Sequence, residues 1–252
     1  MSWKVIGASV QGTSHQANGS PCQDVHLYRV LPGGVLLVAV ADGAGSAART
    51  GEGAALAVEH AIGALEAALG DAWPGDAAAW RVLLADCVTA ARAAIVQLAE
   101  RDASPLRLFA TTLIVAIAAP GQLITGQVGD GLAVAVDAGG NLLLAARPQR
   151  GEYANEACFI TMPQASDLLD VQVHDLAIRS LAVSSDGLLR LALKLPGLEP
   201  HAPFFKPLFD YIAGVDDETV AGHQLADFLC SPRVCDRTDD DKTLVLAANS
   251  MA

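Results

Sequence analysis

The 252-residue sequence has no long uninterrupted apolar run, and its first residues include no hydrophobic stretch of the kind that a signal peptide carries. A helix that spans a bilayer needs roughly 18 consecutive apolar residues. We therefore expect a cytoplasmic protein with no membrane partner.

Cysteines are few, and they are spread along the chain. The five thiols form no CxxC pair, so neither a disulfide framework nor a structural zinc site is predicted. Reduced and mostly buried thiols are the expected state.

Basic residues are also in short supply. The chain has 16 Lys and Arg against 28 Asp and Glu, which gives a formal net charge of −12. No cluster of basic and aromatic residues offsets that charge locally, so a nucleic-acid partner is not expected. An acidic composition suits a soluble surface, and it also supplies carboxylates for hard divalent cations.

Apolar residues, by contrast, are plentiful. Hydrophobic residues make up 52% of the chain and charged residues only 17%, which predicts a large buried core. The length fits a single domain over residues 1–252.

The spacing of these apolar residues changes along the chain. Periods near 3.6 predict helices over residues 47–69, 76–100, 203–213 and 218–229. Short apolar runs predict strands over residues 5–10, 24–31, 35–41, 111–118, 122–128, 132–137, 141–145, 170–175, 181–185 and 243–248.

Four of the predicted strands, between residues 111 and 145, are joined by links too short for a parallel crossover. We expect them to form one antiparallel meander. Strand-rich segments that alternate with helix pairs predict an α+β fold, in which antiparallel sheets are covered by helices.

Aspartates stand at the ends of several predicted strands, next to glycine or to another aspartate. They are Asp24, Asp42, Asp130, Asp186 and the run Asp239-Asp240-Asp241. Each one alone would fit an ordinary turn. If they converge at one sheet edge, their charges repel unless cations neutralise them. Oxygen ligands without His or Cys favour Mg²⁺ or Mn²⁺.

The ordered series of motifs resembles the metal-dependent protein phosphatases of type 2C, in particular their compact bacterial branch. The matching segments are Cys22-Gln23-Asp24, residues 40–46, 110–113, 127–131, 184–187 and 240–244, with a further likeness at residues 151–156. Each motif is weak by itself, but together they span almost the whole chain in the family's order. The resemblance implies a four-layer αββα sandwich of two antiparallel sheets flanked by helix pairs.

The resemblance also implies roles for individual residues. Asp42 would bridge two Mn²⁺ or Mg²⁺ ions, and the Gly43 carbonyl, Asp186 and Asp240 would complete the shell of one of them. Asp24 would hold the second ion, partly through water, and Asp130 would bind a possible third ion. A water held between the ions would attack phosphoserine or phosphothreonine directly. The chain has no CxxxxxR loop and no G-x-S-x-G elbow, which agrees with a route lacking a covalent intermediate.

The sequence departs from better-known family members at two places. Residues 16–21 contain no arginine to bind the phosphate, and Ala44 stands where a histidine often follows the Asp-Gly pair. We consider His15 or Arg49 as substitutes, although a loop histidine and a surface arginine are ordinary alternatives. The resemblance further implies a phosphorylated protein substrate, opposite a serine/threonine kinase.

Two other functions fit parts of the sequence. A non-catalytic binding module would keep the fold without the missing arginine and histidine. A nucleotide-binding enzyme is suggested by G-x-G-x-x-A at residues 43–48. That motif needs a second parallel strand with an acidic end about 20 residues later, whereas a helix is predicted there.

Overall fold

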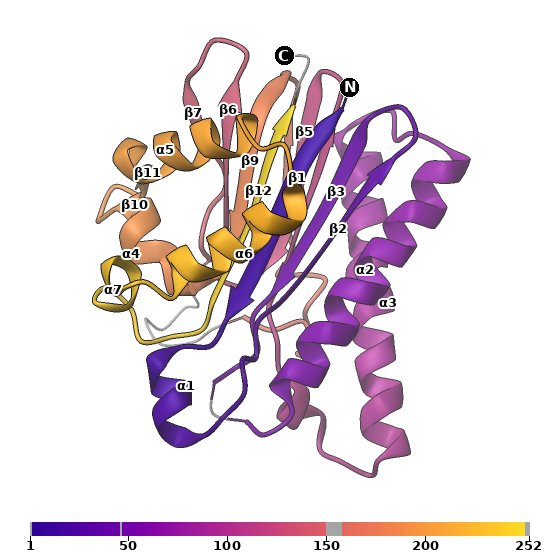
Figure 1. Ribbon diagram of the computed structural model, residues 1–252. Coiled ribbons are helices and arrows are strands. Elements are labelled where there is room, and N and C mark those ends of the chain that lie inside the picture. The colour runs from indigo at the N-terminus through magenta and orange to yellow at the C-terminus, as the bar shows by residue number, and fades with distance from the viewer. Residues whose placement is uncertain (1, 46, 150–157, 250–252) are drawn as a thin grey trace.

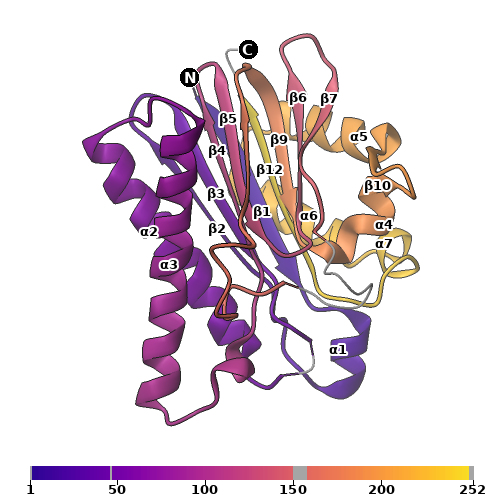
Figure 2. The same cartoon turned by 180° about the vertical axis from the view of Figure 1, so that it is seen from behind.

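The computed structural model describes residues 2–45, 47–149 and 158–249. Two five-stranded sheets pack face to face, and a pair of helices covers each outer surface (Figures 1 and 2). This confirms the predicted four-layer αββα sandwich. The stretch at residues 151–156 lies outside the described residues.

Each sheet combines strands from both halves of the chain. The first sheet has the order β1 (Trp3–Val10), β12 (Lys242–Asn249), β9 (Ile178–Ser184), β6 (Leu132–Asp137) and β7 (Leu142–Ala146). The second has the order β2 (Val25–Leu31), β3 (Val35–Ala41), β4 (Leu113–Ala119), β5 (Gln122–Val128) and β8 (Asp170–His174). All pairings within these sheets are antiparallel, so the described strands lack the parallel arrangement that a dinucleotide-binding fold requires.

Alternating side chains of the central strands fill two different cores. In β3, Leu37 and Ala39 face the layer of helices α2 (Thr50–Asp71) and α3 (Ala77–Arg101), whereas Leu36 and Val38 face the other sheet. Because successive side chains of a strand point to opposite faces, a strand covered on both sides must be apolar throughout. This explains the continuous apolar run at residues 35–41.

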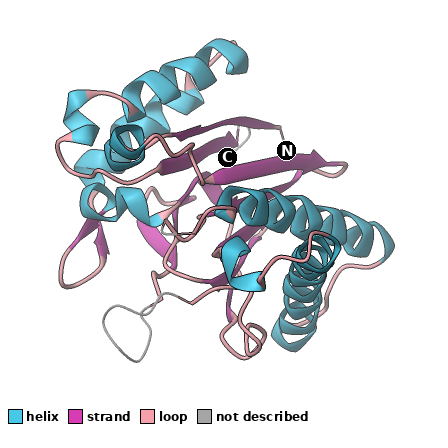
Figure 3. Ribbon diagram, turned by 90° about the horizontal axis from the view of Figure 1, so that it is seen from below, coloured by secondary structure: helices cyan, strands magenta, loops and turns pink. Residues whose placement is uncertain are grey.

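Each helix of the two pairs buries one apolar stripe of its surface in a core. Helices α2 (Thr50–Asp71) and α3 (Ala77–Arg101) cover the second sheet, and α5 (Ala202–Ala213) and α6 (Glu218–Leu229) cover the first (Figure 3). Helix α3 is long and apolar enough to meet the composition of a membrane span. The buried residues of α3 between Trp80 and Ala99 pack in the core with α2 and the second sheet. This packing explains why α3 is so apolar.

The predicted four-stranded meander is wrong. Strands β4 and β5 form a hairpin in one sheet, and β6 and β7 form a hairpin in the other. The link Gly129-Asp130-Gly131 crosses between the sheets instead of joining neighbours. Gly129 has φ +122°, and a Cβ there would lie 2.5 Å from the Cβ of Thr112, so only glycine permits this crossing.

Several short elements were not predicted from the sequence. They are α1 (Thr13–Asn18), the 3₁₀ helices η1 (Leu106–Phe109) and η2 (Asp186–Leu188), α4 (Leu189–Ala192), α7 (Pro232–Cys235) and the two-residue strands β10 (Leu193–Lys194) and β11 (Glu199–Pro200). Helices of three to six residues contain too few turns to show a period. Helix α1 and the ends of β3, β5 and β9 all lie at the lower end of the molecule in Figure 1.

Candidate metal centre

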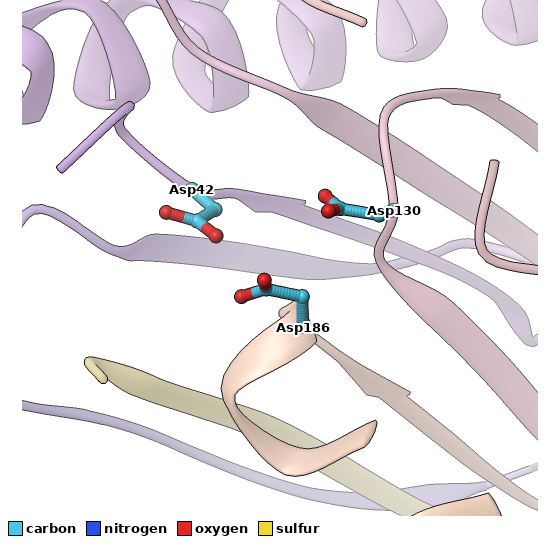
Figure 4. Close-up of side chains that lie close together, drawn as sticks. All are labelled: Asp42, Asp130 and Asp186. Carbon is cyan, nitrogen blue, oxygen red and sulfur yellow. The ribbon is translucent and has the colours of Figure 1, made fainter. Parts of the chain in front are cut away.

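Three carboxylates from distant parts of the chain meet at this end of the sheets. Asp42 follows β3, Asp130 lies in the crossing between β5 and β6, and Asp186 begins η2 after β9. One oxygen of each carboxylate lies within 4.8 Å of an oxygen of both others, and Figure 4 shows the three side chains turned toward a common space. The predicted convergence of Asp42, Asp130 and Asp186 is therefore confirmed.

The glycines after two of these aspartates allow close approach of the backbone. A Cβ on Gly43 would lie 2.7 Å from the Cβ of Thr50, at the start of α2. A Cβ on Gly187 would lie 2.0 Å from the carbonyl oxygen of Asp241. Here the Asp-Gly pairs are sites where two segments press together, and a side chain would separate them.

Asp24 and Asp240 border the same cluster. Asp24 is only 4% exposed, and its Oδ2 accepts a hydrogen bond of 2.6 Å from the hydroxyl of Ser185, next to Asp186. Burial, and then the charge on Asp186, raises the pKa of Asp240. The charge on Asp240 in turn adds to burial and to the other carboxylates in raising the pKa of Asp42. Five carboxylates thus share one electrostatic environment.

Burial and mutual repulsion disfavour the ionised forms of these groups. Burial raises the pKa of Asp24 to about 7. Burial, followed by the charge on Asp186, raises the pKa of Asp130 to about 6. For Asp42, burial acts first and the charges on Asp24 and Asp186 add to it, so its pKa lies well above the ordinary value. A divalent cation would reverse these shifts by stabilising the carboxylates.

Unpartnered oxygens show that the cluster fits such a cation. Oδ1 of Asp24 and Oδ1 of Asp186 are buried and have no hydrogen-bond partner among the described residues. Leaving a buried acceptor unsatisfied costs about 1–3 kcal/mol, and more for a charged group. Hard divalent ions prefer an all-oxygen set of this kind.

Asp241 is an important residue that the sequence reasoning missed. It is 3% exposed, and its carboxylate accepts backbone hydrogen bonds of 2.6 Å from both Gly12 and Gln23. Its Oδ2 also lies 2.9 Å from Nδ1 of His15. Asp241 therefore fastens the start of β12 to the segment that carries Asp24. Three adjacent aspartates gave no signal of which one points inward.

The two proposed substitutes for the missing phosphate ligands differ in their surroundings. His15 lies in α1, is buried, and is held by Asp241; its Nε2 would be 3.5 Å from a Cβ on Gly45, so the ring faces the loop after Asp42. The guanidinium of Arg49 instead donates to Glu52 and Asp102 and lies 4.4 Å above the ring of Phe109. Its charge is already paired.

Comparisons with known proteins agree with this geometry. A family model for protein phosphatase 2C matches residues 11–230. Serine/threonine-protein phosphatase 3 of Escherichia coli K12 is 38% identical over 253 residues, which cover 98% of each chain.

Solved structures share the fold at low identity. A serine/threonine phosphatase of S. agalactiae has a TM-score of 0.66 at 18% identity, and the match covers 98% of this chain and 99% of that one. The catalytic domain of the phosphatase PstP, solved in complex with two manganese ions, has a TM-score of 0.60 at 17% identity, with 98% and 97% covered. From the family match, the curated relative and the cluster of carboxylates, we conclude that the chain belongs to the protein phosphatase 2C family of metal-dependent serine/threonine phosphatases.

Proposed function

We propose that this chain removes phosphate from phosphoserine or phosphothreonine of protein substrates and uses two Mn²⁺ or Mg²⁺ ions to do so. The observation that supports this most directly is the cluster of Asp42, Asp130 and Asp186, in which carboxylate oxygens from both sheets lie within 4.8 Å of one another. The buried, unpartnered oxygens of Asp24 and Asp186 add to it.

The five carboxylates are proposed to divide between the ions. Asp42 lies centrally, since the charges on Asp24, Asp186 and Asp240 all act on it. It would contact both ions, with the Gly43 carbonyl, Asp186 and Asp240 on one side and Asp24 on the other. Asp130 would contribute to a third ion.

The cations would supply two kinds of chemistry: they lower the pKa of bound water and neutralise charge on the phosphoryl oxygens. The protein must hold the ions and prevent its carboxylates from repelling one another. It must also supply a proton to the serine or threonine oxygen that departs. His15, oriented by Asp241 and facing the Ala44–Gly45 loop, is our candidate for this proton donor. Arg49 is not included, because its guanidinium is paired with Glu52 and Asp102.

Hydrolysis of an aryl phosphate with and without Mn²⁺ tests the function. We expect Mn²⁺-dependent turnover, and a loss of more than about 100-fold in Asp42→Asn and Asp240→Asn, because ligand changes remove the ions that hold the substrate. The matched control is Asp210→Asn, which removes one charge from the exposed surface of α5. Metal binding without any turnover of aryl phosphates or phosphopeptides would instead favour a non-catalytic binding module.

The proton donor has its own test. His15→Gln should lower turnover of a phosphothreonine peptide more than turnover of an aryl phosphate, because an aryl oxide leaves readily without a proton. Binding of Mn²⁺ should stay unchanged. Equal kinetics of the variant and the parent on both substrates would remove His15 from the reaction.

The biological setting follows from the same reaction. A phosphatase of serine and threonine side chains acts on the products of a serine/threonine kinase, so we propose that such a kinase opposes this enzyme in the cytoplasm. Phosphoproteomic comparison of cells with and without Asp42→Asn would identify substrates, and unchanged serine and threonine phosphorylation would contradict the proposal.

A further inference from the structure

A pocket of about 710 Å³ opens beside the metal centre. Three segments form its walls: the loop between Asp42 and helix α2, the 3₁₀ helix η1, and the chain at residues 159–162. Most of its lining is apolar and includes Ala44, Ala48, Leu106, Leu108, Phe159 and Met162. A concave apolar site of this volume is large enough for one or two amino-acid side chains.

Hydrogen bonds connect the pocket directly to the metal ligands. The N–H of Ala44, two residues after Asp42, donates to the carbonyl of Ala110 at 3.0 Å. The N–H of Ile160 donates to the carbonyl of Thr111 at 3.0 Å, and the hydroxyl of Thr111 donates to the carbonyl of Asp42 at 3.0 Å. A group bound in the pocket would therefore lie at a fixed position relative to the metal centre.

Arg49 keeps one wall in place. Its N–H donates to the carbonyl of Leu108 at 3.2 Å, and its guanidinium donates to Asp102 at 2.7 Å. The same guanidinium lies 4.4 Å above the ring of Phe109 in η1. These contacts join η1 to the start of α2, so the pocket is formed without a ligand. A preformed pocket binds with a smaller entropy cost.

Arg107 places a positive charge at the rim. It lies in η1 between two apolar lining residues, its side chain is exposed, and that side chain has no ion pair or hydrogen bond with the described part of the chain. The remaining lining residues carry no charge. In a protein with a net charge of −12, a free cation beside an apolar pocket complements a ligand that combines an apolar group with a carboxylate.

We propose that this pocket, called here the Arg107 pocket, binds the substrate protein itself. It would accept an apolar side chain close in sequence to the phosphorylated residue, while Arg107 pairs with a nearby Asp or Glu of the substrate. The inference rests on the proposed phosphatase function and adds a sequence preference to it: phosphoserine or phosphothreonine flanked by an apolar and an acidic residue.

Phosphothreonine peptides that differ only at the flanking positions test the preference. With Mn²⁺ present, replacing the apolar flank by serine should lower kcat/KM by about tenfold, as expected for loss of one buried aliphatic side chain. Arg107→Glu should lower kcat/KM for peptides with an acidic flank and raise it for peptides with a lysine there. Ala48→Phe, which fills the pocket from its exposed rim, should abolish the preference for the apolar flank.

Small substrates and a matched variant provide the controls. An aryl phosphate carries neither flanking residue, so the turnover of each variant on a peptide is expressed relative to its turnover on the aryl phosphate. Arg179→Glu makes the same charge change at an exposed position at the far end of β9, and it should not alter any peptide preference. Thermal unfolding of each variant excludes loss of structure.

Binding of the unphosphorylated peptides, followed by fluorescence anisotropy, needs no catalysis. Weaker binding of the peptides to Arg107→Glu and Ala48→Phe than to the parent would support the pocket. A lack of phosphate hydrolysis by the parent would count against the proposed phosphatase function but not against the pocket. Equal peptide binding and equal kcat/KM in parent and variants would overturn the inference. A dimer that Ala48→Phe dissociates would also overturn it, since a second copy would then occupy the pocket.

Discussion

At the scale of single residues, the site depends on carboxylates whose ionised forms are destabilised by burial and by mutual repulsion. Asp24 is nearly inaccessible to solvent and accepts one hydrogen bond from Ser185, yet its second oxygen has no partner among the described residues. Such a group lowers the stability of the metal-free protein, which the protein tolerates because the same group is ready to bind an ion.

The pKa of Asp24 leads to a prediction about pH. Its ordinary pKa is 3.8, and burial raises it to about 7 in the folded protein. Between these pH values the folded state holds more protons than the unfolded state, so the stability due to this group is full below pH 4 and is lost as the pH rises toward 7. In the presence of a chelator, the free energy of unfolding should fall by about 3 kcal/mol more between pH 4.5 and 7.5 in the parent protein than in Asp24→Asn.

Urea unfolding at the two pH values measures this difference. The amide introduced by Asp24→Asn would keep an oxygen acceptor for the hydroxyl of Ser185. The substitution also removes the charge that helps to raise the pKa of Asp42, so the comparison measures Asp24 together with its effect on Asp42. The same slope with pH in both proteins would show that Asp24 is not the group that titrates.

Glycine at position 187 gives a second prediction at this scale. In Gly187→Ala the new Cβ would lie 2.0 Å from the carbonyl oxygen of Asp241, and one of the two segments must move. We expect a loss of more than about 2 kcal/mol of stability together with weaker Mn²⁺ binding. Gly63→Ala is the control, because Gly63 is exposed within α2 with open space around it. It should gain about 0.5–1 kcal/mol. Chemical denaturation and metal titration of both variants provide the measurement.

At the scale of secondary-structure elements, the strands could be predicted from the sequence better than the way they combine. Continuous apolar runs identified β3 and β5 with the correct ends, since a strand buried on both faces has little freedom in composition. The ends mattered most, because Asp42 and Asp130 lie just beyond them. The prediction that β5 pairs with β6 was wrong. The sequence of a three-residue link does not show whether it joins neighbouring strands of one sheet or crosses between two sheets.

The charges around the site show a similar limit. Asp241 and Asp240 are adjacent in sequence, yet the first binds the backbone of Gly12 and Gln23 while the second lies in the electrostatic field of Asp186. Alternation along a strand cannot assign their directions, because both precede β12. Arg49 looked equally available for phosphate until the structure placed Glu52 and Asp102 against it.

The start of α3 supports a prediction for this scale. Asp76 precedes the helix and its Oδ1 accepts a hydrogen bond of 2.8 Å from the N–H of Ala79. Asp76→Ala should lower stability by about 1 kcal/mol, because an N–H in the first turn loses its acceptor. Asp76→Asn should cost much less, since asparagine caps helices about as well. Denaturant unfolding of the two variants checks the order, and equal losses would mean that charge, not capping, is the cause.

At the scale of the whole molecule, the cluster of carboxylates combines residues from the ends of both sheets. Asp24 and Asp42 flank strands of one sheet, whereas Asp186 and Asp240 flank strands of the other. An ion bound by aspartates of both sheets would link the two sheets at this end, where the carboxylates otherwise repel one another. Metal binding and sheet packing should therefore depend on each other.

This dependence can be measured as ligand-induced stability. Mn²⁺ at 100 times its dissociation constant should raise the free energy of unfolding by about 2.7 kcal/mol for one site, and by more if two ions bind. Asp186→Asn should lose most of that gain because it removes a ligand from one sheet. Asp210→Asn, an equal charge change on exposed α5, should keep it. If Mn²⁺ stabilised the Asp186→Asn protein as much as the parent, the ions would not lie between the sheets, and repulsion among the carboxylates would have to be relieved by protonation alone.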